Sequence, residues 1–156
     1  MKALVLLMSL AAAGVASAQA SEPLVDAAAV EACFADALPG DGSPDCLGDQ
    51  VKACTEASPD GETTIGMGAC IQAETAVWDD LLNREYTARR DDWSDRPELV
   101  ETLTKAQRAW IAFRDADCSL AYDRWDGGSM RSIAAANCRM VATARRALDL
   151  KDMGPM

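Results

Sequence analysis

Six cysteines and a complete lack of histidine limit the chemistry that this chain can carry. Imidazole is the commonest general base, the usual partner of nucleophilic serine or cysteine, and the commonest metal ligand. The cysteines also form no C-x-x-C pair, which argues against a zinc site. An even cysteine count is typical of disulfide frameworks in exported proteins. The sequence therefore predicts disulfides, with no metal, no cofactor and no catalytic residue.

Acidic side chains are the other groups that could do chemistry. Two carboxylates can hydrolyse a glycoside when a cleft holds the sugar between them and keeps one of them protonated. A compact helical protein offers no obvious cleft, so we expect faces that contact solvent or a partner, and we expect no enzyme activity. The candidate contact residues combine acids with tryptophans at helix ends: Asp91, Asp92, Trp93, Asp95, Glu98, Asp117 and Trp125.

Helices must position these residues, because alanine, leucine, glutamate and arginine dominate the chain and strand signals are nearly absent. Turn residues separate five predicted helices, at residues 23–38, 46–57, 68–93, 98–125 and 130–151. The fourth helix should end at Gly127 and Gly128, and Ser129 should cap the fifth. The predicted fold class is all-α, a small disulfide-linked antiparallel bundle with a C-terminal helical hairpin.

The fourth predicted helix carries two neighbouring lines of residues. Its apolar line has the three- and four-residue steps of a seam that packs against other helices: Leu99, Leu103, Ala106, Trp110 and Phe113. A second line, partly polar, lies beside it: Leu103, Gln107, Trp110, Arg114 and Cys118. A half-buried arginine needs a carboxylate or several carbonyls, because an unpaired buried charge is costly. We expect Asp79 or Glu74 to pair with Arg114.

These polar residues have two interpretations. The first is a structural seam that fixes the register of the helices, made of Asp79, Asn83, Tyr86, Gln107, Trp110 and Arg114. In that seam Gln107 and Asn83 would bond each other or the end of a helix backbone. The second is a recognition patch in which Trp78, Tyr86 and Trp110 anchor a partner.

Six cysteines allow 15 pairings, and helix geometry narrows the choice. Cys33 and Cys46 flank the turn at residues 39–44, and Cys54 and Cys70 flank the loop at 59–68. Similar helical spans separate Cys118 and Cys138 from the turn at Gly127, so they should lie level across the hairpin. We predict these three local disulfides, each worth about 3 kcal/mol in the chain-entropy model.

The first twenty residues read as a secretory signal peptide, with Lys2, an apolar run at 3–15 and two A-x-A cleavage sites. No cysteine stands at the cleavage point, so we expect no lipid anchor, and no later apolar run approaches the ~20 residues of a membrane span. The net charge is −10, and −11 without Lys2. Such a protein repels nucleic acid and attracts cationic partners.

Three stretches together resemble a known family. They are Gly68-Ala69-Cys70 followed by Trp78-Asp79 and Asn83; the run AQRAWIAFRDADC at 106–118; and GGSM at 127–130 followed by Cys138 and TARR at 143–146. In this order and spacing they resemble the LprI-like lysozyme inhibitor domain, over residues 54–150. The matching motif positions are Cys54, Cys70, Asp79, Leu82, Asn83, Tyr86, Gln107, Trp110, Arg114, Cys118, Cys138 and Arg146.

The resemblance implies a helical, disulfide-linked domain in the periplasm or outside the cell, and the family name implies inhibition of lysozyme. We divide the chain into a signal peptide (1–20), an N-terminal helical extension (21–47) and an LprI-like domain (48–151). The predicted function is a binding protein that blocks a lysozyme by protein–protein contact, with a basic lysozyme as partner. The alternative is an envelope interaction module that does not inhibit lysozyme.

Overall fold

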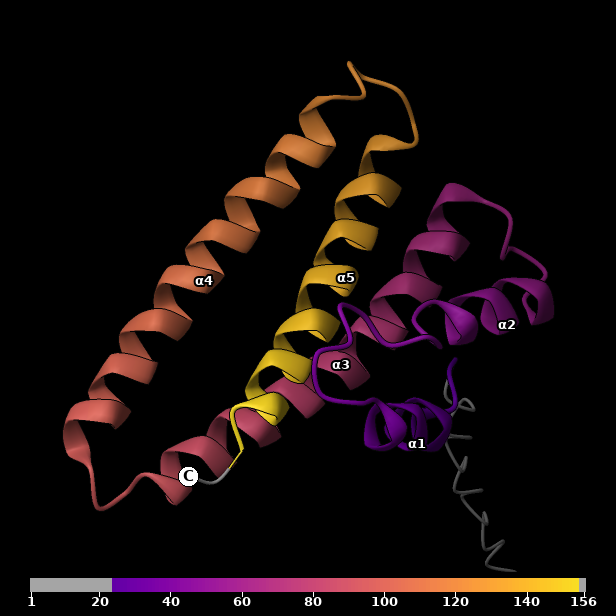
Figure 1. Cartoon of the computed structure of the whole chain (residues 1–156). Coiled ribbons are helices and arrows are strands. Elements are labelled where there is room, and N and C mark those ends of the chain that lie inside the picture. Colours follow the sequence, from indigo (N-terminus) through magenta and orange to yellow (C-terminus); the bar gives the residue numbers. More distant parts are fainter. Residues whose placement is uncertain (1–23, 155–156) are drawn as a thin grey trace, which may run out of the picture.

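The computed structural model describes residues 24–154, and five helices account for most of them. They are α1 (Ala27–Asp36), α2 (Asp49–Ala57), α3 (Thr64–Asp92), α4 (Pro97–Asp123) and α5 (Arg131–Asp152). This is the predicted all-α bundle, with α4 and α5 as its C-terminal hairpin (Figure 1). The predicted signal peptide at 1–20 lies outside the described residues.

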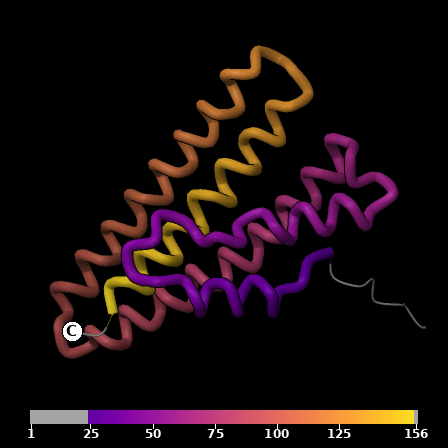
Figure 2. Tube along the Cα trace, turned by 45° about the vertical axis from the view of Figure 1, so that its right-hand side comes forward, coloured from indigo at the N-terminus to yellow at the C-terminus, as the bar shows by residue number. Residues whose placement is uncertain are grey.

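Helix α5 lies between the other two long helices. It packs along both α3 and α4, whereas α3 and α4 make few contacts with each other. Figures 1 and 2 show α3 and α4 diverging from the turn that joins them, with α4 as the outermost element. Helices α1 and α2 pack on α3, on the side away from α4. We call the part where α1 and α2 pack on α3 the covered side of the bundle. The outer face of α4 is the open side, because no helix among residues 24–154 packs on it.

The core forms where α1, α3 and α5 meet. Trp78 of α3 is fully buried, and the ring of Phe34 from α1 meets it edge-on at a centroid distance of 6.3 Å. Ala144 and Ala147 are also fully buried, and such small side chains allow α5 to approach its neighbours closely. Burial of apolar side chains in this core stabilises α1, α3 and α5, although the chain carries many charged residues.

Two charged side chains attach the N-terminal segment to the long helices. The fully buried Glu74 of α3 accepts hydrogen bonds from the backbone N–H groups of Gly48 (2.8 Å) and Val51 (2.9 Å), at the start of α2. It also accepts one from the indole of Trp78 (3.0 Å). A helix start has unpaired N–H groups and partial positive charge, so this carboxylate caps α2 from outside.

Lys151 does the reverse at the end of α1. Its ammonium donates to the backbone carbonyls of Phe34 (2.6 Å), Ala35 (2.9 Å) and Ala37 (2.9 Å). The last carbonyls of a helix carry partial negative charge, so a cation there is stabilising. The next residue, Asp152, accepts from the N–H of Gly40 (2.9 Å). The end of α5 thus holds the segment that follows α1.

The three disulfides join Cys33 to Cys46, Cys54 to Cys70 and Cys118 to Cys138, as the sequence predicts. Their Cα atoms are 6.3, 5.7 and 5.5 Å apart, within the usual range. All six cysteines are used. None of the helices within residues 24–154 is both long enough and apolar enough to cross a membrane.

Several predicted helix starts are wrong. Helix α1 begins at Ala27, four residues after the predicted start, because Asp26 caps it by accepting from the N–H of Ala29 (3.2 Å). Helix α2 begins at Asp49, three residues after the predicted start, and its N-cap is Gly48.

Helix α3 begins at Thr64, four residues before the predicted start, because Thr63 caps it by accepting from the N–H of Gly66 (3.0 Å). A side chain at Gly66 would overlap the carbonyl of Asp60, so this glycine permits a close approach and does not end the helix. Ser129 does not cap α5, whose N-cap position is Met130. Gly127 does adopt the expected left-handed conformation, with φ +85°.

The predicted apolar seam of α4 is half wrong. Leu103 is buried, but Ala106 and Phe113 are exposed. The inward face is the second, partly polar line, in which Gln107 and Cys118 are buried and Trp110 and Arg114 are half-buried. The Cys118 disulfide and the bulky Trp110 and Arg114 side chains take up the inner side of α4. Phe113 is therefore left exposed at the edge of the α4–α5 interface, where it borders a shallow pocket with Val141 and Arg145 of α5.

Candidate functional site

The predicted contact residues lie in two groups at opposite ends of α4. Asp91 and Asp92 end α3, Trp93 is its C-cap, Asp95 lies in the turn and Glu98 is in the first turn of α4. Asp117 and Trp125 lie near the other end of α4, about 28 Å away at the helical rise. The fold does not bring the seven residues together, so at most one group can form a single compact site.

The first group is only partly an exposed acidic surface. All four of its acids are exposed, but Asp92 forms an ion pair with Arg89 (2.9 Å), and Arg90 and Arg96 are close in sequence. Trp93 is half-buried and packs against the core. Its indole nitrogen is buried and has no hydrogen-bond partner among residues 24–154. Trp93 is therefore mainly a packing residue, with its acidic neighbours around it.

The polar seam exists, but its contacts differ from those predicted. Tyr86 and Thr104 share a hydrogen bond of 3.2 Å, which links α3 to α4. Gln107 does not meet Asn83, because it accepts from Arg146 of α5 (3.0 Å) while Asn83 donates to Asp79 (3.0 Å) on its own helix. Both Asp79 and Asn83 are exposed. The seam therefore runs mainly between α4 and α5.

Arg114 pairs with neither Asp79 nor Glu74, because α5 separates most of α3 from α4. It donates to its neighbour Asp115 at 2.9 Å and 3.0 Å. Its guanidinium stacks 5.0 Å from the centre of the Trp110 ring, and that of Arg146 lies 5.9 Å from the same ring. Cation–π contacts of this kind hold two arginines beside one tryptophan. The arrangement is a structural clamp between α4 and α5.

The position of Arg146 affects its acidity. Burial lowers the pKa of the Arg146 guanidinium from its ordinary value, and Asp149, 3.9 Å away, raises it in part. A cation in this place depends on its hydrogen bond to Gln107 and on the Trp110 ring to offset lost hydration. Gln107 and Trp110 of α4 therefore hold the Arg146 side chain in place.

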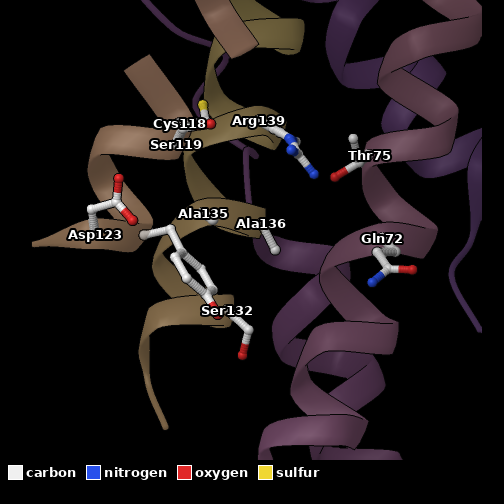
Figure 3. Close-up of a pocket in the computed structure, with 10 residues that line it drawn as sticks. Gln72, Thr75, Cys118, Ser119, Asp123, Ser132, Ala135, Ala136 and Arg139 are labelled. Carbon is white, nitrogen blue, oxygen red and sulfur yellow. The ribbon is translucent and has the colours of Figure 1, made fainter. Parts of the chain in front are cut away.

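A groove that the sequence did not predict opens where α3 and α4 diverge over α5 (Figure 3). It encloses about 820 Å³. Gln72 and Thr75 of α3 form one wall and Ser119 and Asp123 of α4 the other, and Arg139 reaches from α5 toward Thr75. Helical periodicity could not reveal it, because the groove follows from the angle between two helices.

The groove carries polar groups suited to binding. The hydroxyls of Thr75, Ser119 and Ser132 donate to backbone carbonyls of nearby residues in their own segments. The amide of Gln72, the carboxylate of Asp123 and the guanidinium of Arg139 supply its other polar ends. Asp123 is the only carboxylate among the lining residues, so the carboxylate pair used in glycoside hydrolysis does not meet in this groove.

Negative charge is concentrated in a region that the sequence reading did not select. Residues 24–62 hold nine acidic side chains and a single lysine, whereas residues 63–154 hold fifteen acids and thirteen cations. All nine are exposed. Four of them, Asp36, Asp41, Asp45 and Asp49, line a hollow beside the Cys33–Cys46 disulfide. Counting charges along the chain, in place of searching for acidic clusters, would have found this region.

Comparison with known proteins supports the resemblance seen in the sequence. The family model described as lysozyme inhibitor LprI matches residues 54–150, which is more than half of the chain. The chain belongs to the lysozyme inhibitor LprI family. The LprI match covers α3, α4, all but the last two residues of α5 and two of the disulfides, and the Cys33–Cys46 disulfide lies before it.

Curated relatives of the chain match over short regions. An uncharacterized protein of Rhizobium meliloti is 43% identical over 54 residues, which are 35% of this chain and 39% of that protein. The uncharacterized protein YecT of Escherichia coli is 28% identical over 86 residues, which are 49% of this chain and 53% of YecT. The chain thus spans about half or less of these relatives. No solved structure matches it.

Proposed function

We propose that this LprI-family protein is a periplasmic or secreted inhibitor that binds a basic lysozyme by protein–protein contact. The family match supports inhibition as the activity. The single observation that carries the mode of binding is the uneven charge: nine exposed acids and one lysine on residues 24–62. A localised negative field attracts a cationic enzyme and raises its association rate.

The acidic region is also rigid enough to act as a binding surface. The Cys33–Cys46 disulfide closes it, and Glu74 and Lys151 fix both of its helices by hydrogen bonds to the backbone. A surface ordered before binding loses less conformational entropy when the complex forms. The acids at the α3–α4 turn remain a second candidate contact region, and Asp117 with Trp125, near the other end of α4, are a third.

The proposed location rests on sulfur chemistry and on the N-terminus. All six cysteines are paired, and disulfides persist in oxidising compartments outside the cytoplasm. The signal peptide predicted at 1–20 would deliver the chain there. Cell fractionation followed by mass measurement of the exported protein tests both points, since it detects cleavage and the loss of six thiol hydrogens.

A lysis assay with the oxidised protein and chicken-, goose- and invertebrate-type lysozymes tests the activity. We expect inhibition of at least one enzyme at micromolar protein, weaker at high salt because exposed charges are screened. Absence of inhibition and of binding at both salt concentrations would reject the proposal for these enzymes. Recovery of a different envelope protein in a pull-down would instead favour the interaction-module alternative.

Two matched triple variants locate the surface. One changes Asp36, Asp45 and Asp49 to asparagine; the other changes Asp91 and Asp95 to asparagine and Glu98 to glutamine. Each removes three exposed negative charges. We expect the first to slow association several-fold at low salt and the second to have less effect. The opposite order would move the contact surface to the α3–α4 turn.

A further inference from the structure

The outer face of α4 is apolar and uncovered. Phe113 is 67% exposed and Leu120 is 58% exposed, the highest values for large apolar side chains on this helix. Ala109 and Ala116 alternate with them and are also exposed. The residues of this outer stripe follow three- and four-residue steps over about 21 Å of helix: Ala106, Ala109, Phe113, Ala116 and Leu120.

All five side chains of this stripe are exposed, although Phe113 also borders a shallow pocket with Val141 and Arg145 of α5. Helix α4 is the outermost element in both views, and α5 packs along its inner face (Figures 1 and 2). Steps of three and four residues are the pattern by which two helices pack together along their length. The stripe therefore has the form of half of a helix pair whose other half is missing.

We infer that the missing half is the α4 helix of a second copy of this chain, in antiparallel orientation about a two-fold axis. The sizes of the side chains support this arrangement. In an antiparallel pair centred between residues 114 and 115, Phe113 of one copy meets Ala116 of the other, and Leu120 meets Ala109. Each large side chain thus faces a small one, which allows the helices to approach.

The charges along α4 differ between its two halves. The first half carries two acids and two cations, and its Lys105 pairs with Glu101 of the same helix at 2.6 Å. The second half is more acidic, with Asp115, Asp117 and Asp123 beside Arg114. The antiparallel pair places Lys105 of one copy near Asp123 of the other. A parallel pair would set the two acidic halves side by side and would be disfavoured. The stripe is therefore self-complementary in size, as a two-fold interface requires, and the charges favour the antiparallel orientation.

The contact is small, since it involves one helix face from each copy. Interfaces of this size belong to the weak and reversible class. We expect a dimer with a dissociation constant in the micromolar range. Sedimentation equilibrium of the oxidised protein, from micromolar to near-millimolar concentration, measures it directly. A protein that stays monomeric throughout this range would overturn the inference.

A matched pair of variants tests the face. Phe113→Asp places a charge in the centre of the stripe and should raise the dissociation constant about tenfold or more. Ile65→Asp changes an equally apolar residue that is 87% exposed at the start of α3, and should leave it unchanged. Because both side chains are exposed, circular dichroism should show the same helix content in both. A dimer that survives Phe113→Asp overturns the assignment.

A charge exchange tests the register. Lys105→Glu should weaken the dimer, because the new carboxylate would lie near the carboxylate of Asp123 in the other copy. The double change Lys105→Glu and Asp123→Lys should restore it, since the pair is re-formed with reversed signs. Failure of the second change to restore association contradicts the antiparallel register. Loss of lysozyme binding in Phe113→Asp, with wild type monomeric, would show that the enzyme covers this face instead.

Discussion

Helices α1 and α4 both lie at the periphery of the bundle, but they are attached in different ways. The α1–α2 segment is joined to α3 and α5 by two charged side chains that hydrogen-bond to backbone groups, the buried Glu74 and the half-buried Lys151. Helix α4 is joined to α5 by the Cys118–Cys138 disulfide and by Arg146, which donates to Gln107 and lies over the Trp110 ring. The ten-residue α1 buries Val30 and Phe34 almost completely, while the 27-residue α4 leaves Ile111, Phe113 and Leu120 exposed.

The difference shows how length affects what a helix must bury. A helix of ten residues is unstable alone, so α1 needs apolar burial and an external cap at its end. Helix α4 is long, contains many good helix formers and is covalently tied near its C-terminal end, so it can leave one face uncovered. The covered side therefore provides the buried contacts that stabilise the fold, whereas the open side leaves a helix face available for contact with a partner.

Replacing a phenylalanine by alanine on the covered side and on the open side should give the largest difference in the free energy of unfolding. Phe34→Ala removes a ring that is 2% exposed and packs on Trp78, and should cost about 3–5 kcal/mol. Phe113→Ala removes an exposed ring and should change the free energy of unfolding by less than about 0.5 kcal/mol. Denaturant unfolding of the oxidised monomer measures both. Similar losses would contradict the assignment of a covered and an open side.

Removing one disulfide from each side should sharpen the comparison. The loops closed by Cys33–Cys46 and Cys118–Cys138 are similar in length, so each double alanine variant should lose about 3 kcal/mol of global stability. Local effects should differ. Without Cys118–Cys138, amide exchange in the second half of α4 should increase, because few other buried contacts hold it. Hydrogen exchange that rises equally in α1 and α4 would argue against this view.

Glu74→Gln should have a smaller effect that is confined to the covered side. The amide keeps one acceptor oxygen but turns an NH₂ group toward a backbone N–H, so it leaves a buried donor unpaired. We expect a loss of about 2 kcal/mol. Glu56→Gln, at an exposed glutamate of α2, is the control and should change stability little. If the two variants were equally stable, the carboxylate of Glu74 would not be the cap that holds α2.

The sequence was a good guide where local rules decide the structure. Cys118 and Cys138 pair because they lie at similar helical spans from the same turn, and the turn at Gly127 needs a left-handed residue. It was a poor guide where a side chain serves a distant backbone. Glu74 was expected to pair with a cation and instead caps α2, since unpaired N–H groups of another helix do not show in a side-chain pattern.

The candidate site was less predictable than the fold. Periodicity chose Ala106 and Phe113 for the inner face of α4, because apolar spacing cannot recognise that Trp110, Arg114 and a disulfide will take that place. The angle between α3 and α4, which separates Arg114 from Asp79 and opens the groove beside Arg139, depends on packing against α5. The untested contact residues remain predictions.

The hydrogen bonds from Lys151 to Phe34, Ala35 and Ala37 span 117, 116 and 114 positions of the chain. A ribosome makes the first helix early and the lysine almost at the end, so α1 cannot gain its final cap until nearly all of the protein exists. During that interval α1 can contact only elements made before Lys151, such as Trp78 of α3, and its last carbonyls have no cation to cap them. The first helix to be synthesised is therefore among the last to be completed.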